Sequence, residues 1–419
     1  MMKRIFCLFL AGLMLLAAAA CAAKQQNAQA EAPTAAPVNT EQPTEAPAET
    51  PTEEPAVTEA PNAALQYVEA ATVEEFLAAI ASNTEIVLTG DVYDLQTVTK
   101  ENGVLELCNF EQLHIIGSGN TVLLHAAILA EFCTNFLLSG VTVCGNEEDL
   151  VALQQCSASR IDGCSFINGD GYWSPNGISI QSCDGILVSD CSAEGCVMAM
   201  YAIGSSEIGI SNCDIHDCAT AIWLSGSSDV LVDGCKLHDC WQYEEPGPDE
   251  PEGDASFWVQ LDGGCTGVQF VNCEVYGNSC TFLFGMESVG EAVFESLNVH
   301  GNEAESFFSL DAFDAEISGR IAFDNCDMTD NRIGTFLYAN PEESNAEITL
   351  SGTSVRSNRI ERLFWGGDVT VTGCEFKDNT VDHWIYIDEE YNPDVRAFVH
   401  DGDGNELGEA ELAAMTLAR

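Results

Sequence analysis

A repeat of about 22 residues dominates the sequence and restricts the folds that the chain can adopt. The segment EIGISNCDIHDC at 207–218 returns as DVLVDGCKLHDC at 229–240. Weaker copies keep a Gly, Asn or Asp, or in one case Ser296, before a small or apolar residue, which we call the pivot. Because one such unit cannot bury a hydrophobic face alone, the sequence predicts a solenoid of stacked units. The pivots are Cys164, Cys191, Cys213, Cys235, Cys273, Leu297, Cys326, Thr353 and Cys374.

The residues inside each repeat alternate with a period of two, which is typical of β-strands. Ile208 and Ile210 point to one side of a first strand, and Cys213 and Ile215 to one side of a second. The Gly, Asn or Asp before the pivot tolerates the left-handed backbone of a sharp corner. A third strand follows, as at 221–224, and no segment of helix length separates the strands. The repeat therefore predicts an all-β parallel solenoid rather than βαβ units.

This pattern resembles the right-handed parallel β-helix of the pectate-lyase-like superfamily. The similarity covers roughly residues 84–390. It implies a right-handed, single-stranded parallel β-helix of about 11 coils at 97–390. We expect a C-terminal hairpin or tail at 391–419. The resemblance is specific for the fold and unspecific for the function.

Residues 64–96 resemble the N-terminal cap that is common in such proteins. Thr72 and Glu75 have the spacing of a capping box, and an apolar stripe follows at helical spacing. We therefore expect a short capping helix and then a first strand at 84–89. A helix at this position covers the open end of the hydrophobic core, which a solenoid requires.

The first residues resemble a bacterial export signal. Residues 1–20 combine a basic start with an apolar run, and the sequence AAAC at 18–21 resembles the lipobox of bacterial lipoproteins. This resemblance implies that Cys21 is lipidated and anchors the protein to the membrane, facing the extracytoplasmic side at the cell surface. A plain signal peptide and an uncleaved anchor are the alternatives. Residues 21–63, rich in Pro, Thr, Glu and Ala, are predicted to be a disordered linker.

The charge of the chain limits its partners. It has 67 acidic and 14 basic residues and a formal net charge of −53. Such a field repels nucleic-acid phosphates, and it opposes contact with anionic membranes or polyuronates unless a cation mediates. We therefore expect no nucleic-acid partner and membrane contact only through the lipid anchor. The expected partner, a polysaccharide or a surface protein, follows from a strand face described below, and the chain is expected to be a monomer.

The cysteines follow the repeat. Without Cys7 and Cys21, 17 of the 19 cysteines remain, and most occupy the pivot, the position eight before it or the position five after it. In later repeats asparagine replaces cysteine at the third position. The C-x-x-C spacing of metal sites is absent, so these rows are predicted to be reduced core thiols, with disulfides between adjacent coils as the alternative. No cofactor is expected, apart from a candidate calcium site.

One strand face carries the first candidate site. In the superfamily, substrates usually lie along the outer face of the strand that follows the pivot pair. Reading that position along the chain predicts an outward row that is aromatic in its middle and apolar later, which suits sugar stacking or a protein partner. The predicted glycan or partner face is Tyr201, Trp223, Gln260, Leu283 and Phe308, continued by Leu337, Phe364 and Ile385.

Two weaker candidates are polar. An outer row three residues after the pivot could hold a metal ion or relay a proton, although exposed strand ends also explain it. It comprises His216, His238 and His300, with Asp217 and Asp239 directly after the first two. The insertion at 242–256 is a candidate calcium loop, and a solvated acidic loop is the alternative. Its carboxylates are Glu244, Glu245, Asp249, Glu250, Glu252 and Asp254.

These observations favour a non-catalytic, surface-tethered β-helix that binds a polysaccharide or protein along the aromatic face. The predicted row lacks Asp, Glu, Lys and Arg, whereas glycoside hydrolysis needs two carboxylates and lyases of this fold use an outward basic residue. No catalytic residue is assigned. The alternatives are a polysaccharide lyase or glycoside hydrolase of the same fold, and a purely structural spacer.

Overall fold

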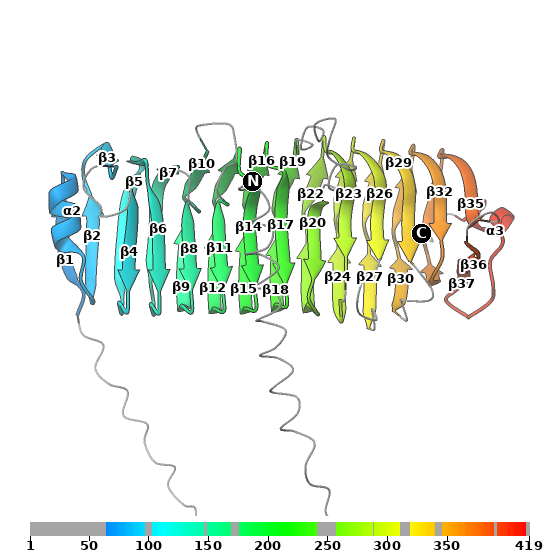
Figure 1. Ribbon diagram of the computed structural model, residues 1–419. Helices are drawn as coiled ribbons and strands as arrows, with labels where there is room; N and C mark the ends of the chain where they lie inside the picture. Colours follow the sequence, from blue (N-terminus) through cyan, green and yellow to red (C-terminus); the bar gives the residue numbers. More distant parts are fainter. Residues whose placement is uncertain are drawn as a thin grey trace, which may run out of the picture. The chain divides into compact units, whose positions relative to one another are not determined.

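The computed structural model describes residues 64–96, 103–145, 149–168, 176–240, 257–287, 289–310, 319–339, 346–388 and 392–415. The predicted signal peptide, Cys21, the linker at 21–63 and the acidic insertion with its six carboxylates lie outside the described residues. The described part is an all-β, right-handed parallel β-helix, as the repeat predicted, with about 10 turns where about 11 coils were expected. Figure 1 shows its strands side by side in the order of the sequence.

One parallel sheet, sheet B, is formed by the strand that begins a few residues after the pivot in each coil. Neighbouring coils pair in register, for example Tyr201 with Trp223 and Trp223 with Gln260. The parallel strands of sheet B are β4 (Val104–Cys108), β6 (Ala127–Glu131), β8 (Val151–Gln154), β11 (Ile178–Gln181), β14 (Met198–Ile203), β17 (Thr220–Ser225), β20 (Phe257–Asp262), β23 (Ser279–Met286), β26 (Glu303–Leu310), β29 (Arg332–Ala339), β32 (Arg359–Trp365) and β35 (Thr380–Asp388). Strand β36 (Asn392–Arg396) continues it antiparallel to β35.

The strands before and after each pivot form a second sheet, sheet A. Those before the pivot, or equivalent to it, are β1 (Gln66–Ala70), β2 (Thr84–Leu88), β5 (Leu113–Leu124), β7 (Leu137–Cys144), β9 (Ser157–Asp162), β12 (Asp184–Ser189), β15 (Ser206–Ser211), β18 (Ser228–Asp233), β21 (Thr266–Val271), β24 (Glu291–Glu295), β27 (Arg320–Asp324), β30 (Glu347–Ser351), β33 (Asp368–Thr372) and β37 (Phe398–Asp401). The short strands after it are β3 (Val92–Asp94), β10 (Ser165–Ile167), β13 (Ser192–Glu194), β16 (Asp214–His216), β19 (Lys236–His238), β22 (Glu274–Tyr276), β25 (Asn298–His300), β28 (Asp327–Thr329), β31 (Ser354–Arg356) and β34 (Glu375–Lys377).

The corner before each pivot has the left-handed backbone that the sequence predicted. Asn212, Gly234 and Asn325 have φ values of 53°, 65° and 56°. Ser296, the one residue at this position that is not Gly, Asn or Asp, also has a φ of 56°. The corner is therefore imposed by the stacking of the coils, and Gly, Asn and Asp are the residues that adopt it at least cost.

Equivalent residues lie above one another and form buried rows. The pivot cysteines, such as Cys213 and Cys235, are buried, and the backbone N–H of Cys213 lies 3.4 Å from the Cys235 sulfur. In later coils the third row is a ladder of side-chain amides, in which each Nδ2 donates to the next Oδ1 at 2.8–3.1 Å. This ladder comprises the asparagines that replace cysteine at the third position of the later repeats: Asn278, Asn302, Asn331, Asn358 and Asn379.

The later coils have a core of stacked phenylalanines. Strand β17 has 6 residues, whereas β23, β26 and β29 have 8 each. The longer strands enlarge the interior, and phenylalanine fills it. Phe294 stacks on Phe323 with ring centroids 5.0 Å apart, and Phe307 stacks on Phe336 at 5.2 Å. Such stacking contributes beyond the burial of apolar area.

Helices lie near both ends of the described β-helix (Figure 1). The N-terminal α2 (Val73–Ala79) confirms the predicted capping helix: Thr72 Oγ1 accepts from the Glu75 N–H, and Glu75 Oε2 accepts from the Ala71 N–H. The C-terminal α3 (Glu409–Ala413), which the sequence did not suggest, lies against β34 and β35 and buries Leu412. No helix in the described ranges is long and apolar enough to cross a membrane.

The buried rows lead to a prediction about the cysteines. Thiol counting on denatured, unreduced protein should find most of the 17 cysteines outside Cys7 and Cys21 free. Burial raises the pKa of Cys265 and of Cys374 to about 11, which keeps both protonated and unreactive near neutral pH. A count of three or fewer would show that disulfides link the rows.

Candidate functional site

Three residues of the predicted face lie in one outward row on sheet B. Tyr201, Trp223 and Gln260 are in register on β14, β17 and β20, and each is half-buried. The side chains on either side of Trp223, Ile222 and Leu224, point into the core. The rings of Tyr201 and Trp223 are 5.3 Å apart and inclined by 59°. We call Tyr201, Trp223 and Gln260 the first platform.

A carboxylate fixes the indole of the first platform. Trp223 Nε1–H donates to Asp262 Oδ2 at 2.8 Å, and Gln260 Nε2 lies 3.5 Å from the same oxygen. Burial raises the pKa of the Asp262 carboxyl. Burial also raises the pKa of Tyr201, and the charges of Asp262 and Asp149 add to this effect. The platform is therefore held rigid and bordered by two acidic groups.

The prediction that Leu283 and Phe308 belong to this outward row is wrong. Both side chains are fully buried in the core, as are Leu337 and Phe364. The eight-residue strands turn two successive side chains inward, such as Phe307 and Phe308, so counting from the pivot in steps of two selects the wrong face. Register shows that the row continues from Gln260 through Gly285, Ser309, Tyr338, Trp365 and Tyr386.

Sequence reasoning missed Asp262 and the aromatic residues at the far end of the row. Asp262 follows Gln260 by two residues in one strand, so the period of two was a signal that could have found it. The period of two could not identify Tyr338, Trp365 and Tyr386 as outward residues, because their position depends on the extra length of the later strands.

The predicted polar row is brought together on the outer face of sheet A. His216, His238, Tyr276 and His300 stack in that order, with ring centroids 5.2, 4.6 and 5.2 Å apart. Their planes are inclined by 18°, 8° and 3°. We call these four residues the aromatic ladder. It follows from the in-register pairing of β16, β19, β22 and β25.

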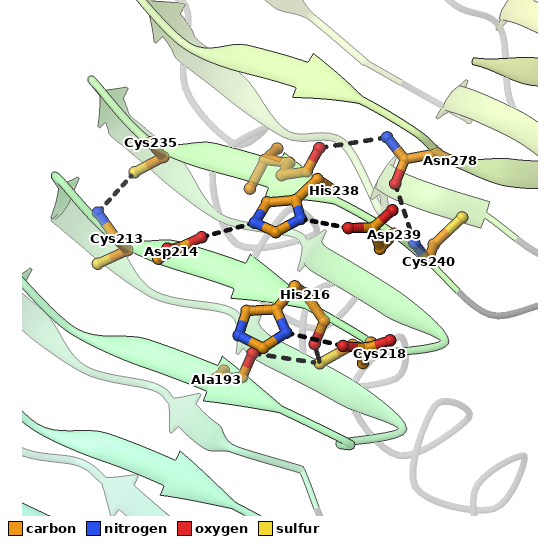
Figure 2. Close-up of polar contacts among 12 residues, drawn as sticks. Ala193, Cys213, Asp214, His216, Cys218, Cys235, His238, Asp239, Cys240 and Asn278 are labelled. Atoms are coloured by element: carbon orange, nitrogen blue, oxygen red, sulfur yellow. Dashed lines mark hydrogen bonds and ion pairs between the residues drawn. The ribbon is translucent and has the colours of Figure 1, made fainter. Parts of the chain in front are cut away.

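Each histidine of the aromatic ladder binds a carboxylate. Nδ1 of His216 lies 2.9 Å from Asp217, and His300 Nε2 lies 3.1 Å from Glu274. His238 lies between two carboxylates, with Nδ1 2.8 Å from Asp239 and Nε2 2.8 Å from Asp214, as Figure 2 shows. Asp214 and Glu274 were not predicted from the sequence. Both nitrogens of His238 are thus occupied by protein groups.

The electrostatics of the aromatic ladder favour a charged His238. Partial burial opposes the charged form, but the hydrogen bonds to Asp239 and Asp214 outweigh it and raise the pKa of His238. Burial raises the pKa of Tyr276, and so do the nearby carboxylates Asp214, Glu274 and Asp239. Within the described ranges, no three His, Cys, Asp or Glu side chains converge at a spacing suited to a metal ion. The ladder is a surface stack of rings in which each histidine contacts a carboxylate.

Comparisons with known proteins agree with the fold. Residues 126–309 match the family model described as right handed beta helix region. Among curated proteins, no sequence relative of the chain was found.

Solved structures of similar arrangement have low sequence identity. A surface adhesin of Streptococcus pneumoniae, PfbA, is 12% identical over 81% of this chain and 89% of its own, with a TM-score of 0.40. Pectate lyase Pel9A is 13% identical over 85% and 90%, with a TM-score of 0.40. A Family 28 exopolygalacturonase of Yersinia enterocolitica is 11% identical over 76% and 78%, with a TM-score of 0.41. Similarities at this level carry no argument about function.

The ion pairs of His238 should make the stability depend on pH. Because its pKa is raised in the folded protein, its stabilisation is complete below the unfolded pKa of about 6.5 and is lost as the pH rises through the folded value. His238→Gln should therefore lower the unfolding free energy by about 1 kcal/mol at pH 5.5 and by less at pH 9. Urea unfolding at both pH values measures this.

A second variant tests whether the ion pairs of His238 cause this pH dependence of stability. Asp239→Asn keeps a residue that tolerates the left-handed backbone found at this position, φ 51°, and removes one of the two carboxylates. It should reduce the same pH dependence. An equal loss of stability at both pH values for His238→Gln would contradict the ion-pair explanation.

Proposed function

We propose that the protein is a non-catalytic, glycan-binding β-helix that is anchored at the bacterial cell surface, and that the first platform contacts the sugar. The observation that carries this proposal is the outward Tyr201–Trp223 pair, 5.3 Å apart on neighbouring rungs, with its indole fixed by Asp262. An aromatic pair that is already ordered loses little conformational entropy when it stacks on a ligand.

Polar groups beside the rings supply hydrogen-bonding capacity for sugar hydroxyls. Gln260 presents a side-chain amide in the same row, and the Asp262 carboxylate borders it. An apolar surface with a few polar groups is typical of binding sites for small ligands. Since the chain carries a net charge of −53, we infer that the glycan is neutral rather than polyanionic.

One observation favours an enzymatic alternative. Asp262 is a partly buried carboxyl with a raised pKa, next to an aromatic face, and such a group can act as a general acid. Glycoside hydrolysis also requires a second carboxylate, for which Asp149 is the candidate, since its charge acts on Tyr201. Release of reducing or unsaturated ends from a polysaccharide would favour this alternative, and binding without release would favour the first proposal.

The first platform leads to a binding prediction. Trp223→Ala should weaken binding to a neutral polysaccharide by about 1–3 kcal/mol, because it removes a large aromatic contact. Affinity electrophoresis of the full chain in gels that contain laminarin, galactomannan, xyloglucan or arabinoxylan measures this effect. Polygalacturonate serves as the polyanion and should give no retardation, owing to charge repulsion.

Leu231→Ala is the matched control, because Leu231 is an apolar side chain of the same coil that is 43% exposed on sheet A. It should retain wild-type binding. A Trp223→Ala variant that keeps both its melting temperature and its wild-type affinity would contradict the proposed platform. A loss of about 3–5 kcal/mol in stability would instead assign Trp223 to the core.

The proposed anchor leads to a separate prediction. Cys21→Ser should release the protein from the membrane fraction, because the acyl chains on that cysteine supply the stable attachment. Cell fractionation with immunodetection measures the distribution. An unchanged distribution, together with an intact N-terminal segment by mass spectrometry, would exclude lipidation at Cys21.

A further inference from the structure

The outward row of sheet B carries a second aromatic group at its C-terminal end. Tyr338, Trp365 and Tyr386 are in register on β29, β32 and β35, and each is half-buried. The ring centroids of Tyr338 and Trp365 are 4.9 Å apart, and those of Trp365 and Tyr386 are 5.3 Å apart. These distances resemble that of the Tyr201–Trp223 pair. We call this group the second platform.

An arginine is built into the second platform. The Arg362 guanidinium lies 5.2 Å from the centre of the Trp365 ring and 4.9 Å from that of Tyr386. Its Nη1 donates to Thr335 Oγ1 at 3.2 Å, and its Nη2 to Glu361 Oε1 at 2.7 Å. The side chain is 27% exposed. These contacts fix the cation against the rings and order both.

Two donors of the second platform have no acceptor in the part of the chain that the structure describes. They are Trp365 Nε1 and Arg362 Nε, and both atoms are buried. A buried N–H without an acceptor costs about 1–3 kcal/mol. A side-chain shift that uncovers either donor would let it donate to an oxygen-rich ligand.

A groove lies over the first residues of β23, β26, β29 and β32, and two of these strands, β29 and β32, carry Tyr338 and Trp365 further along. Its volume is about 410 Å³, and Arg332, Arg359, Glu305, Glu361 and Asp382 are among the residues that line it. Glu361 of the groove also accepts from Arg362, so this contact connects the groove with the cation that lies against Trp365 and Tyr386. Carboxylates and guanidinium groups present paired acceptors and donors, which match adjacent hydroxyl groups on a sugar.

The two platforms lie on one line. From Trp223 the row passes Gln260, Gly285 and Ser309 before it reaches Tyr338. Four steps of about 4.8 Å place Trp223 and Tyr338 about 19 Å apart along the β-helix axis. Gly285 and Ser309 are buried and small, so neither side chain projects between the platforms.

We propose that the second platform and its groove form a second saccharide subsite, and that one extended neutral glycan occupies both platforms. This rests on the proposed glycan binding at the first platform and adds the class of ligand: a polysaccharide chain rather than a short oligosaccharide. Once the first platform holds one part of the chain, the second part binds at a high effective concentration. Affinity therefore rises when the glycan is long enough to span both platforms.

The test uses the full chain and the neutral polysaccharide, among laminarin, galactomannan, xyloglucan and arabinoxylan, that retards the wild type most. Trp365→Ala should weaken polysaccharide binding about tenfold, and the double variant with Trp223→Ala more than either single variant. The disaccharide of the same polymer cannot span the platforms. Titration calorimetry should find two disaccharide sites on the wild type and one on each single variant.

Two further variants separate a loss of binding from a loss of stability. Tyr386→Ala tests the same platform if Trp365→Ala lowers the melting temperature, and Leu231→Ala should behave as the wild type. Wild-type affinity of Trp365→Ala and Tyr386→Ala, with a loss for Trp223→Ala, would overturn the second subsite alone. A loss for Trp365→Ala without one for Trp223→Ala would overturn the first platform and support the second. No retardation of the wild type by any of the four polysaccharides would overturn both.

Discussion

In-register stacking of each coil on the next is the interaction on which the rest of this structure depends. Parallel pairing places every residue against its counterpart one repeat later, as with Tyr201, Trp223 and Gln260. A side chain type that recurs at one position of the repeat therefore forms a continuous row along the β-helix. Inside the β-helix a row must be apolar or fully hydrogen-bonded, because it is shielded from water. The cysteine rows meet the first condition, and the asparagine ladder meets the second.

The same constraint explains why the core changes along the chain. Strands β23, β26 and β29 have 8 residues each and pair in register with one another, so the wider interior of one coil continues in the next. The larger interior must be filled, because a void forfeits dispersion contacts. Phe294 and Phe323, stacked at 5.0 Å, and Phe284 and Phe308, also at 5.0 Å, fill it.

On the outside, rows are free of the packing constraint and can carry function. The aromatic ladder shows what stacking alone produces: three imidazoles and a phenol in parallel, each histidine held by a carboxylate. Its nitrogens are largely occupied by protein groups, so we interpret it as a stabilising feature. The row on sheet B differs, because its rings are inclined rather than parallel and are grouped at two places with small residues between them. This arrangement suits an extended ligand.

The sequence by itself determined the repeat, the parallel β-helix, the capping helix with Thr72 and Glu75, and the identity of the buried cysteine and asparagine rows. These follow from local patterns: a period of two, turn residues that tolerate a left-handed backbone, and a capping box. It also placed Tyr201, Trp223 and Gln260 together, because the early coils have equal strand lengths. Tertiary structure alone decided which way Leu283, Phe308 and Trp365 point, since two successive inward side chains break the alternation that sequence reasoning requires. In the longer later strands the predicted apolar residues face the core, and Tyr338, Trp365 and Tyr386 take their place in the outward row.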